Sequence, residues 1–116
     1  GFADLSGKPT GEPSSVVRAR VNAARARQRE RFKNDDILTN AEMDAALIGK
    51  YCRPDPKSEQ LLKNAYERMQ LSARAYQRIL KVARTIADVE GSEEIDFGHY
   101  AEAIQSRTLD RGREER

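Results

Sequence analysis

The fold is decided by residues 71–88, LSARAYQRILKVARTIAD. Apolar side chains recur in this stretch every three or four residues, which is the spacing of one face of an α-helix. Ser72 can cap the first turn with its hydroxyl, and Gly91 can end the helix in the left-handed conformation. The sequence therefore predicts a helix from Ala73 to Val89 at the centre of the fold. Its apolar face comprises Ala75, Tyr76, Ile79, Leu80, Val82, Ala83, Ile86, Ala87 and Val89.

Two further helices are predicted upstream of this stretch. Thr39 and Glu42 have the spacing of a capping box, so we expect a helix that begins after Thr39 and ends before Pro54. Asp55 and Pro56 supply an N-cap and a favourable first-turn residue for the next helix. The buried face of that helix is expected to contain Leu61, Leu62, Ala65, Tyr66 and Met69.

The outer helices are marked less strongly. We expect a first helix, capped by Ser14 or Ser15, whose apolar stripe is interrupted at Gln28 and otherwise contains Val17, Val21, Ala24 and Phe32. Asp96 can cap a last helix that runs to about Arg107. The expected architecture is an all-α bundle of four to five helices over residues 14–109. Residues 1–13 have the glycine and proline content of a linker or extended tether, and the charged residues 110–116 are expected to fray.

Composition excludes several classes of protein. The 116 residues carry 21 basic and 19 acidic side chains, a balance that does not suit phosphate binding over the whole surface. A single cysteine, Cys52, excludes an internal disulfide and a thiolate-rich metal site, and it favours a cytoplasmic setting. No apolar run approaches the roughly 20 residues of a membrane span, so we expect a soluble protein without a membrane partner.

Catalytic and metal-binding patterns are weak. Five residues separate Gly1 from Gly7 where a phosphate-binding loop has four, and Pro9 replaces the hydroxyl residue that holds magnesium. His99 and Cys52 have no partner at a spacing that would activate them, so we expect both to be packing or surface residues. The sequence therefore predicts no catalytic residue and no metal site, and it does not predict an enzyme.

A strongly basic helix lies within the balanced total charge. Residues 18–33 contain a single acidic side chain, Glu30, against Arg18, Arg20, Arg25, Arg27, Arg29, Arg31 and Lys33. Local binding of nucleic acid is one interpretation. A solvated arginine face, or one that pairs with acidic residues of a neighbouring domain, is the alternative, because aromatic residues for base stacking are missing here. The residues that we expect to contact DNA or a neighbouring domain are Arg18, Arg25, Arg29 and Arg78.

Arg74 occupies an unfavourable position for a cation. It lies in the first turn of the predicted central helix, where the partial positive charge of the helix end disfavours a guanidinium by about 0.3 to 1 kcal/mol. Such a position suits an arginine that binds an anion. The alternative is a solvated arginine with good helix propensity.

Residues 71–88 also closely resemble the C-terminal domain of the magnesium-chelatase-related AAA+ ATPases, of the ComM and YifB type. The resemblance continues upstream in residues 25–32, RARQRERF, and downstream through AEAIQ at 101–105 to residue 111. It implies a helical lid that follows an ATPase core. By this resemblance ATP and magnesium are bound in the full-length parent, and neither is bound by this fragment alone.

The resemblance also implies a role for Arg74. An arginine early in a lid helix of these ATPases, the second-sensor arginine, contacts the γ-phosphate of the nucleotide, and Arg74 stands at the matching position. Whether it serves its own subunit or a neighbour stays open. The implied partners are the AAA+ core of the same chain, neighbouring subunits of a homo-oligomeric ring, expected to be a hexamer, and DNA. The segment Lys33 to Leu38 matches no functional feature.

Other functions remain as alternatives. The domain could be the lid of a true magnesium-chelatase subunit, which drives metal insertion into a porphyrin, although the arginine-rich helix favours the DNA-handling branch. It could also be an autonomous nucleic-acid-binding bundle that uses the first helix, or a structural adaptor that binds proteins. A free-standing enzyme ranks last, since no constellation of catalytic groups is present.

Overall fold

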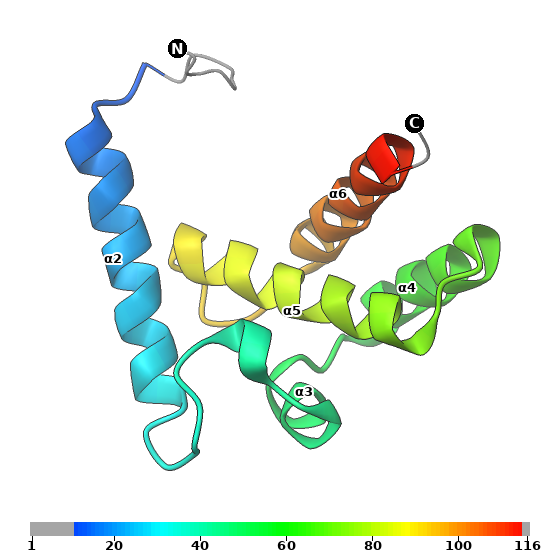
Figure 1. Ribbon diagram of the computed structural model, residues 1–116, viewed down its shortest axis with the longest axis horizontal. Helices are drawn as coiled ribbons and strands as arrows, with labels where there is room; N and C mark the ends of the chain where they lie inside the picture. Colours follow the sequence, from blue (N-terminus) through cyan, green and yellow to red (C-terminus); the bar gives the residue numbers. More distant parts are fainter. Residues whose placement is uncertain (1–10, 115–116) are drawn as a thin grey trace.

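The computed structural model describes residues 11–114, with side chains as far as Leu109. These residues contain no strand, which confirms the predicted all-α fold (Figure 1). Every helix among them is too short or too polar to cross a membrane. The helical elements in chain order are α2 (Ser14–Arg31), the 3-10 helix η1 (Asn40–Glu42), α3 (Ala45–Tyr51), α4 (Pro56–Met69), α5 (Ala73–Glu90) and α6 (Phe97–Glu114).

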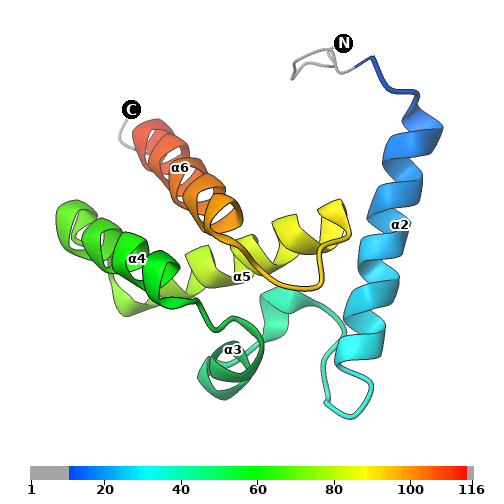
Figure 2. The same cartoon turned by 180° about the vertical axis from the view of Figure 1, so that it is seen from behind.

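Helix α5 is the centre of the bundle, as its sequence predicts. It packs against α2, η1, α3 and α6, while α4 packs against α6. Figures 1 and 2 show α2 beside the C-terminal end of α5 and α4 beside its N-terminal end. The apolar core is formed by α3, α4, α5 and α6 together with residues between the helices such as Phe32 and Met43, so the described residues enclose a core of their own. Its largest fully buried apolar and aromatic side chains are Phe32, Leu62, Ile79 and Tyr100.

The predicted helix ends around α5 are confirmed. The Ser72 hydroxyl accepts a hydrogen bond from the backbone N–H of Ala75 at 3.1 Å. At the other end Gly91 has φ +81°, a conformation that costs glycine little and a β-carbon much. The Asp55 carboxylate likewise caps α4 by accepting the Ser58 N–H at 2.9 Å. Each of these caps joins residues that are close in the sequence, so the cap can be predicted without knowledge of the fold.

The beginning of α2 differs from the prediction. Pro13 is the N-cap, so Ser14 and Ser15 lie within the first turn and do not cap the helix. Val17, expected on the buried stripe, is 42% exposed, whereas Ala24 is 3% exposed. The reason is that only the C-terminal half of α2 packs on the bundle, and its N-terminal half projects beyond the end of α5 (Figures 1 and 2).

The helix predicted after Thr39 is two elements. Glu42 accepts the Thr39 N–H at 2.9 Å, as in the expected capping box, but the capped element is only one 3-10 turn. Met43 is extended, and the Asp44 carboxylate then caps α3 by accepting the Leu47 N–H at 2.9 Å. Asp44 is therefore the helix start that the prediction missed.

The C-terminal boundary was placed too early. Helix α6 extends past Arg107 to Glu114, so residues 110–114, which we expected to fray, are helical. The segment 1–13, expected to form a tether, lies outside the described residues except for positions 11–13.

The burial of α5 gives a prediction for stability. Ile79 is 2% exposed, so Ile79→Ala should lower the free energy of unfolding by about 2 to 5 kcal/mol, the usual cost of emptying a packed aliphatic site. Ile86→Ala should cost less, because Ile86 is only half-buried. Urea unfolding followed by circular dichroism measures both, with the exposed Arg78→Ala as control. Unfolding of Ile79→Ala at the parent's midpoint would contradict the central position of α5.

Candidate functional site

Arg74 and Arg78 lie in one groove along the surface of α5. The groove has a volume of about 710 Å³, and Ala41 of η1 and Glu102 of α6 form part of its wall. Both arginines are exposed, and neither guanidinium makes a hydrogen bond or an ion pair with another residue in the described part of the chain. The α5 side chains that line the groove are Arg74, Gln77, Arg78, Lys81, Val82, Thr85, Ile86, Val89 and Glu90.

The charges in this groove are unevenly distributed. Its cations Arg74, Arg78 and Lys81 belong to the first half of α5, whereas its acidic residues are Glu90, the last residue of that helix, and Glu102 of α6. The first turn of α5 contains no acidic residue that would neutralise Arg74. Because the N-terminal end of a helix also carries partial positive charge, this half of the groove favours an anion.

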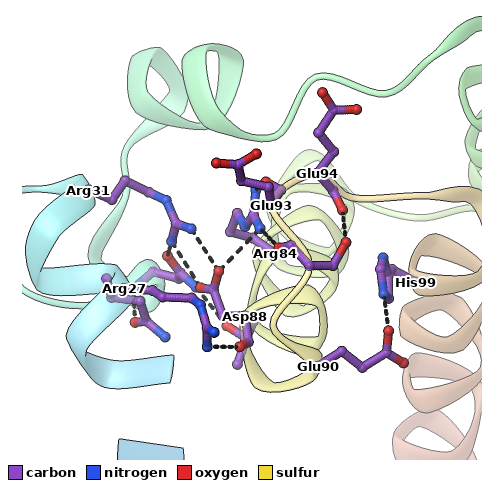
Figure 3. Close-up of polar contacts among 12 residues, drawn as sticks. Arg27, Arg31, Arg84, Asp88, Glu90, Glu93, Glu94 and His99 are labelled. Carbon is purple, nitrogen blue, oxygen red and sulfur yellow. Dashed lines mark hydrogen bonds and ion pairs between the residues drawn. The ribbon is translucent and has the colours of Figure 1, made fainter. Parts of the chain in front are cut away.

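A second polar cluster surrounds Asp88 (Figure 3). The Asp88 carboxylate is fully buried and accepts two hydrogen bonds from the Arg31 guanidinium, at 2.7 and 2.9 Å. It also accepts the side-chain amide of Asn40 at 2.9 Å, and Arg84 forms an ion pair with it at 3.2 Å. One carboxylate therefore joins α2, η1 and α5.

Other hydrogen bonds extend this cluster to its neighbours. Arg27 of α2 donates to the backbone carbonyl of Asp88 at 2.9 Å, one turn before Arg31. Gln28, expected to interrupt the apolar stripe, is buried and its side-chain oxygen accepts the Asn40 N–H at 2.9 Å. Arg84 donates to the carbonyls of Ser92 and Glu93, at 3.1 and 3.2 Å. We call Arg27, Gln28, Arg31, Asn40, Arg84 and Asp88 the Asp88 cluster.

The ionisation of Asp88 reflects these contacts. Burial opposes the charged form, but the hydrogen bonds from Arg31 and Asn40 and the charges of Arg31 and Arg84 outweigh it and lower the pKa of Asp88. Burial also lowers the pKa of Arg84, yet a guanidinium stays protonated at any pH at which the protein is folded. The cluster is therefore charged at neutral pH.

The Asp88 cluster divides the basic residues of α2 into two groups. Arg27 and Arg31 bind Asp88, Arg20 pairs with Glu12, and Lys33, just after the helix, pairs with Glu30. The remaining three are exposed and have no partner among the described residues, namely Arg18, Arg25 and Arg29. These three are the residues of α2 that were predicted from the sequence to contact DNA or a neighbouring domain.

These three arginines share one face of α2. Their spacing of seven and four residues places them in one stripe at about 100° per residue, whereas Ala24, Gln28 and Arg31 are turned about 80° to 140° away from it. We call Arg18, Arg25 and Arg29 the outer arginine face. It is separate from the groove of Arg74 and Arg78, so the structure does not bring the candidates from the two helices together in one site.

His99 and Cys52 are packing residues, as predicted. His99 is 3% exposed; its Nδ1 accepts the Asp96 N–H at 2.9 Å, while the Asp96 carboxylate accepts the His99 N–H at 3.1 Å. His99 therefore completes the cap of α6, and its Nε2 contacts Glu90 at 2.7 Å. Burial raises the pKa of the Cys52 thiol to about 11, so this thiol is a poor nucleophile.

Comparison with known protein families places the fold and its arginines in context. Residues 11–107 match the family described as magnesium chelatase, subunit ChlI C-terminal. The chain belongs to this family. The resemblance inferred from residues 71–88 is therefore confirmed, and the matched region includes α2, the groove of α5 and the Asp88 cluster.

Individual relatives share this region. The chain is 43% identical over 101 residues to the uncharacterized protein YifB of Escherichia coli and 40% identical over 99 residues to the competence protein ComM of Haemophilus influenzae. An uncharacterized protein of Mycobacterium bovis is 34% identical over 97 residues. These alignments cover 87%, 85% and 84% of this chain but 19% of each relative, so the chain spans about a fifth of their length. No solved structure matches the chain significantly.

In this family domain, the buried carboxylate predicts a dependence of stability on charge. Asp88→Asn leaves Arg31 and Arg84 without their counter-charge and should lower the free energy of unfolding by about 3 to 5 kcal/mol at neutral pH. Asp36→Asn, in an exposed loop, is the matched control and should change little. Urea unfolding of both variants measures the difference, and equal midpoints for Asp88→Asn and the parent would contradict the role of the cluster.

Urea unfolding of the parent and of Asp88→Asn at several pH values tests how the charge of Asp88 affects stability. The pKa of Asp88 is lower in the folded chain than the ordinary 3.8, so its contribution is present above that value and is lost as the pH falls through the lowered pKa. The parent should therefore lose stability below about pH 4, and Asp88→Asn should lose less over the same range.

Proposed function

We propose that this domain is the nucleotide-responsive lid of an AAA+ ATPase and that Arg74 contacts the γ-phosphate of ATP held by the ATPase core. The observation that supports this proposal is the position of Arg74, which is exposed in the first turn of α5 and has no partner among the described residues. The 116 residues contain no phosphate-binding loop, so we assign ATP and Mg²⁺ to an ATPase core outside them. The relatives are about five times as long as this chain and have residues for such a core. By itself the domain is not an enzyme.

The chemistry of the site fits a phosphate. A guanidinium forms two parallel charge-assisted hydrogen bonds to phosphate oxygens, and a partner that gains and loses charge during hydrolysis changes the strength of this contact. Arg78 lies one turn further along the same groove and adds to the positive charge. Contact with the nucleotide would therefore make the position of α5 depend on the nucleotide state.

The proposed partners follow from this role. The lid packs on the core of its own chain and on a neighbouring subunit of a homo-oligomeric ring, which we propose to be a cytoplasmic hexamer. Arg74 acts either in its own subunit or across the subunit boundary.

A second function is favoured by the outer arginine face. We propose that Arg18, Arg25 and Arg29 bind the phosphate backbone of DNA, because they form a continuous cationic stripe on the exposed side of α2. The relative ComM is named a competence protein, which agrees with a DNA-handling motor. The competing proposal is metal insertion, as in a magnesium-chelatase subunit. It assigns no binding partner to these three arginines.

Replacement of Arg74 tests the nucleotide contact in the full-length protein. Arg74→Ala should lower the ATPase rate at saturating ATP by about 100-fold or more, because it removes a charge-assisted contact to the reacting phosphate. The lid should stay folded, since a first-turn cation gains nothing from the helix dipole. Arg74→Lys should restore little activity, because lysine cannot form the two parallel bonds.

The matched control is Arg68→Ala, an exposed arginine in the last turn of α4, which should leave the rate unchanged. Mixing Arg74→Ala subunits with subunits that lack a working phosphate loop distinguishes the two arrangements, since activity returns only if Arg74 serves a neighbour. An Arg74→Ala enzyme with the parent's turnover would refute the assignment.

Charge reversal on α2 tests DNA binding. The double variant Arg25→Glu and Arg29→Glu should weaken binding of the full-length protein to DNA and reduce the slope of log affinity against log salt by up to about 2. The matched control reverses Arg53 and Arg68, which are exposed elsewhere and change the net charge equally. Fluorescence anisotropy over a salt series gives both quantities. If both double variants behave alike, the outer arginine face is not the binding site.

A further inference from the structure

Helix α5 carries a functional feature near each end. Arg74 is in its first turn, and Asp88 lies 14 positions later, so the two are separated by about 21 Å of one helix at 1.5 Å per residue. The helix has an uninterrupted apolar face in the core, and no proline or glycine lies between the two residues. A displacement of one end therefore displaces the other.

The attachment of α2 to this helix is mainly polar. Within α2, only Ala24 and Gln28 are buried, and the adjoining Phe32 adds one aromatic side chain to the core. The contacts that fix direction are the bonds of Arg27 and Arg31 to Asp88. Apolar contact is non-directional, whereas paired hydrogen bonds from two successive turns define both the position and the rotation of a helix.

Asp88 is the residue at which these contacts meet. Arg84 lies on the same helix and contacts the carbonyls that follow α5, so it does not reach α2. Asn40 reaches Asp88 from η1 and also donates to Thr85 of α5 at 3.1 Å. Figure 3 shows Arg31 of α2 and Arg84 of α5 at the Asp88 carboxylate, and Asn40 of η1 binds the same carboxylate.

We infer that Asp88 is a positioning residue that makes α2 and α5 one rigid unit, so that the outer arginine face keeps a fixed orientation relative to Arg74. This inference rests on the proposed function in one respect, the identity of the two sites that are joined. Its consequence is reciprocal coupling: a nucleotide contact that moves α5 reorients the outer arginine face, and an anion bound to that face changes the affinity of Arg74 for phosphate.

The first test measures the orientation of α2 directly. Spin labels are attached to Ala23→Cys on α2 and Gln105→Cys on α6, both exposed positions. Cys52 is 1% exposed and therefore stays unlabelled. Double electron–electron resonance on this 116-residue chain should give one narrow distance distribution for the parent and a broad one for Asp88→Asn.

Two further variants keep this test decisive. Arg31→Met removes the α2 contact with the Asp88 carboxylate and leaves Asp88 paired with Arg84 and Asn40, so it should also broaden the distribution even if Asp88→Asn does not fold. Arg20→Met is the matched control on the same helix, because Arg20 pairs with Glu12 and not with α5, and its distribution should stay narrow. A folded Arg31→Met chain with the parent's narrow distribution would overturn the inference.

The second test uses binding of a labelled oligothymidylate by the full-length protein, in which the DNA contact is proposed. Asp88→Asn removes a negative charge, so electrostatics alone predicts tighter binding. The positioning role predicts several-fold weaker binding with an unchanged salt slope, because the outer arginines are still present but no longer held in place. Tighter binding by Asp88→Asn would count against the inference. If the full-length parent does not bind, the proposed DNA contact fails, and the distance measurement still decides the role of Asp88.

Discussion

The buried carboxylate of Asp88 is the constraint on which the arrangement of the helices depends. A charge without exposure is tolerated only when cations and hydrogen-bond donors surround it, and the nearest residues of α5 supply just one of them, Arg84. The others come from α2 and η1, through Arg31 and Asn40. Satisfying one carboxylate therefore brings three segments of the chain together. It also explains why α2, which buries few apolar side chains, has a defined place in the bundle.

The same constraint explains the composition of α2. A helix with this many arginines would repel itself if all of them faced one way, and the fold separates them by direction. Arg31 neutralises the buried Asp88 and Arg27 binds its backbone carbonyl, whereas Arg18, Arg25 and Arg29 have no partner among the described residues. The count of basic residues in the sequence suggests one basic surface, but the structure shows that only part of that charge is available to an external partner.

How much the sequence reveals depends on the range of each interaction. Caps that act within one turn, such as those of Ser72 and Asp55, were predicted correctly because the capping residue and its partner are three positions apart. The second start at Asp44 was missed because the capping box just before it already explained a helix. Gln28 and Asp88 gave no signal, since a polar residue on an apolar face is satisfied by partners 12 to 57 positions away that only the fold brings near. The candidate site was only partly predictable in the same way. Arg74 was identified from its unfavourable place in the first turn of α5 and from the family resemblance. Its exposure and its shared groove with Arg78 required the structure.

Arg31 and Arg74 show how one type of side chain serves two purposes in this domain. Arg31 has its anion inside the protein and is thereby committed to holding α2. Arg74 has no anion within the described residues, and its place at a helix N-terminus makes solvation alone a poor reason for a cation there. Binding of an external anion to such an arginine can change the position of the helix that carries it. The change is transmitted if that helix is rigid and is attached to another part of the domain. Helix α5 meets both conditions, because its apolar face fills the core and its far end holds Asp88. The two arginines are therefore complementary. The Arg31–Asp88 ion pair makes α2 and α5 move together, and Arg74 allows an external anion to shift their position.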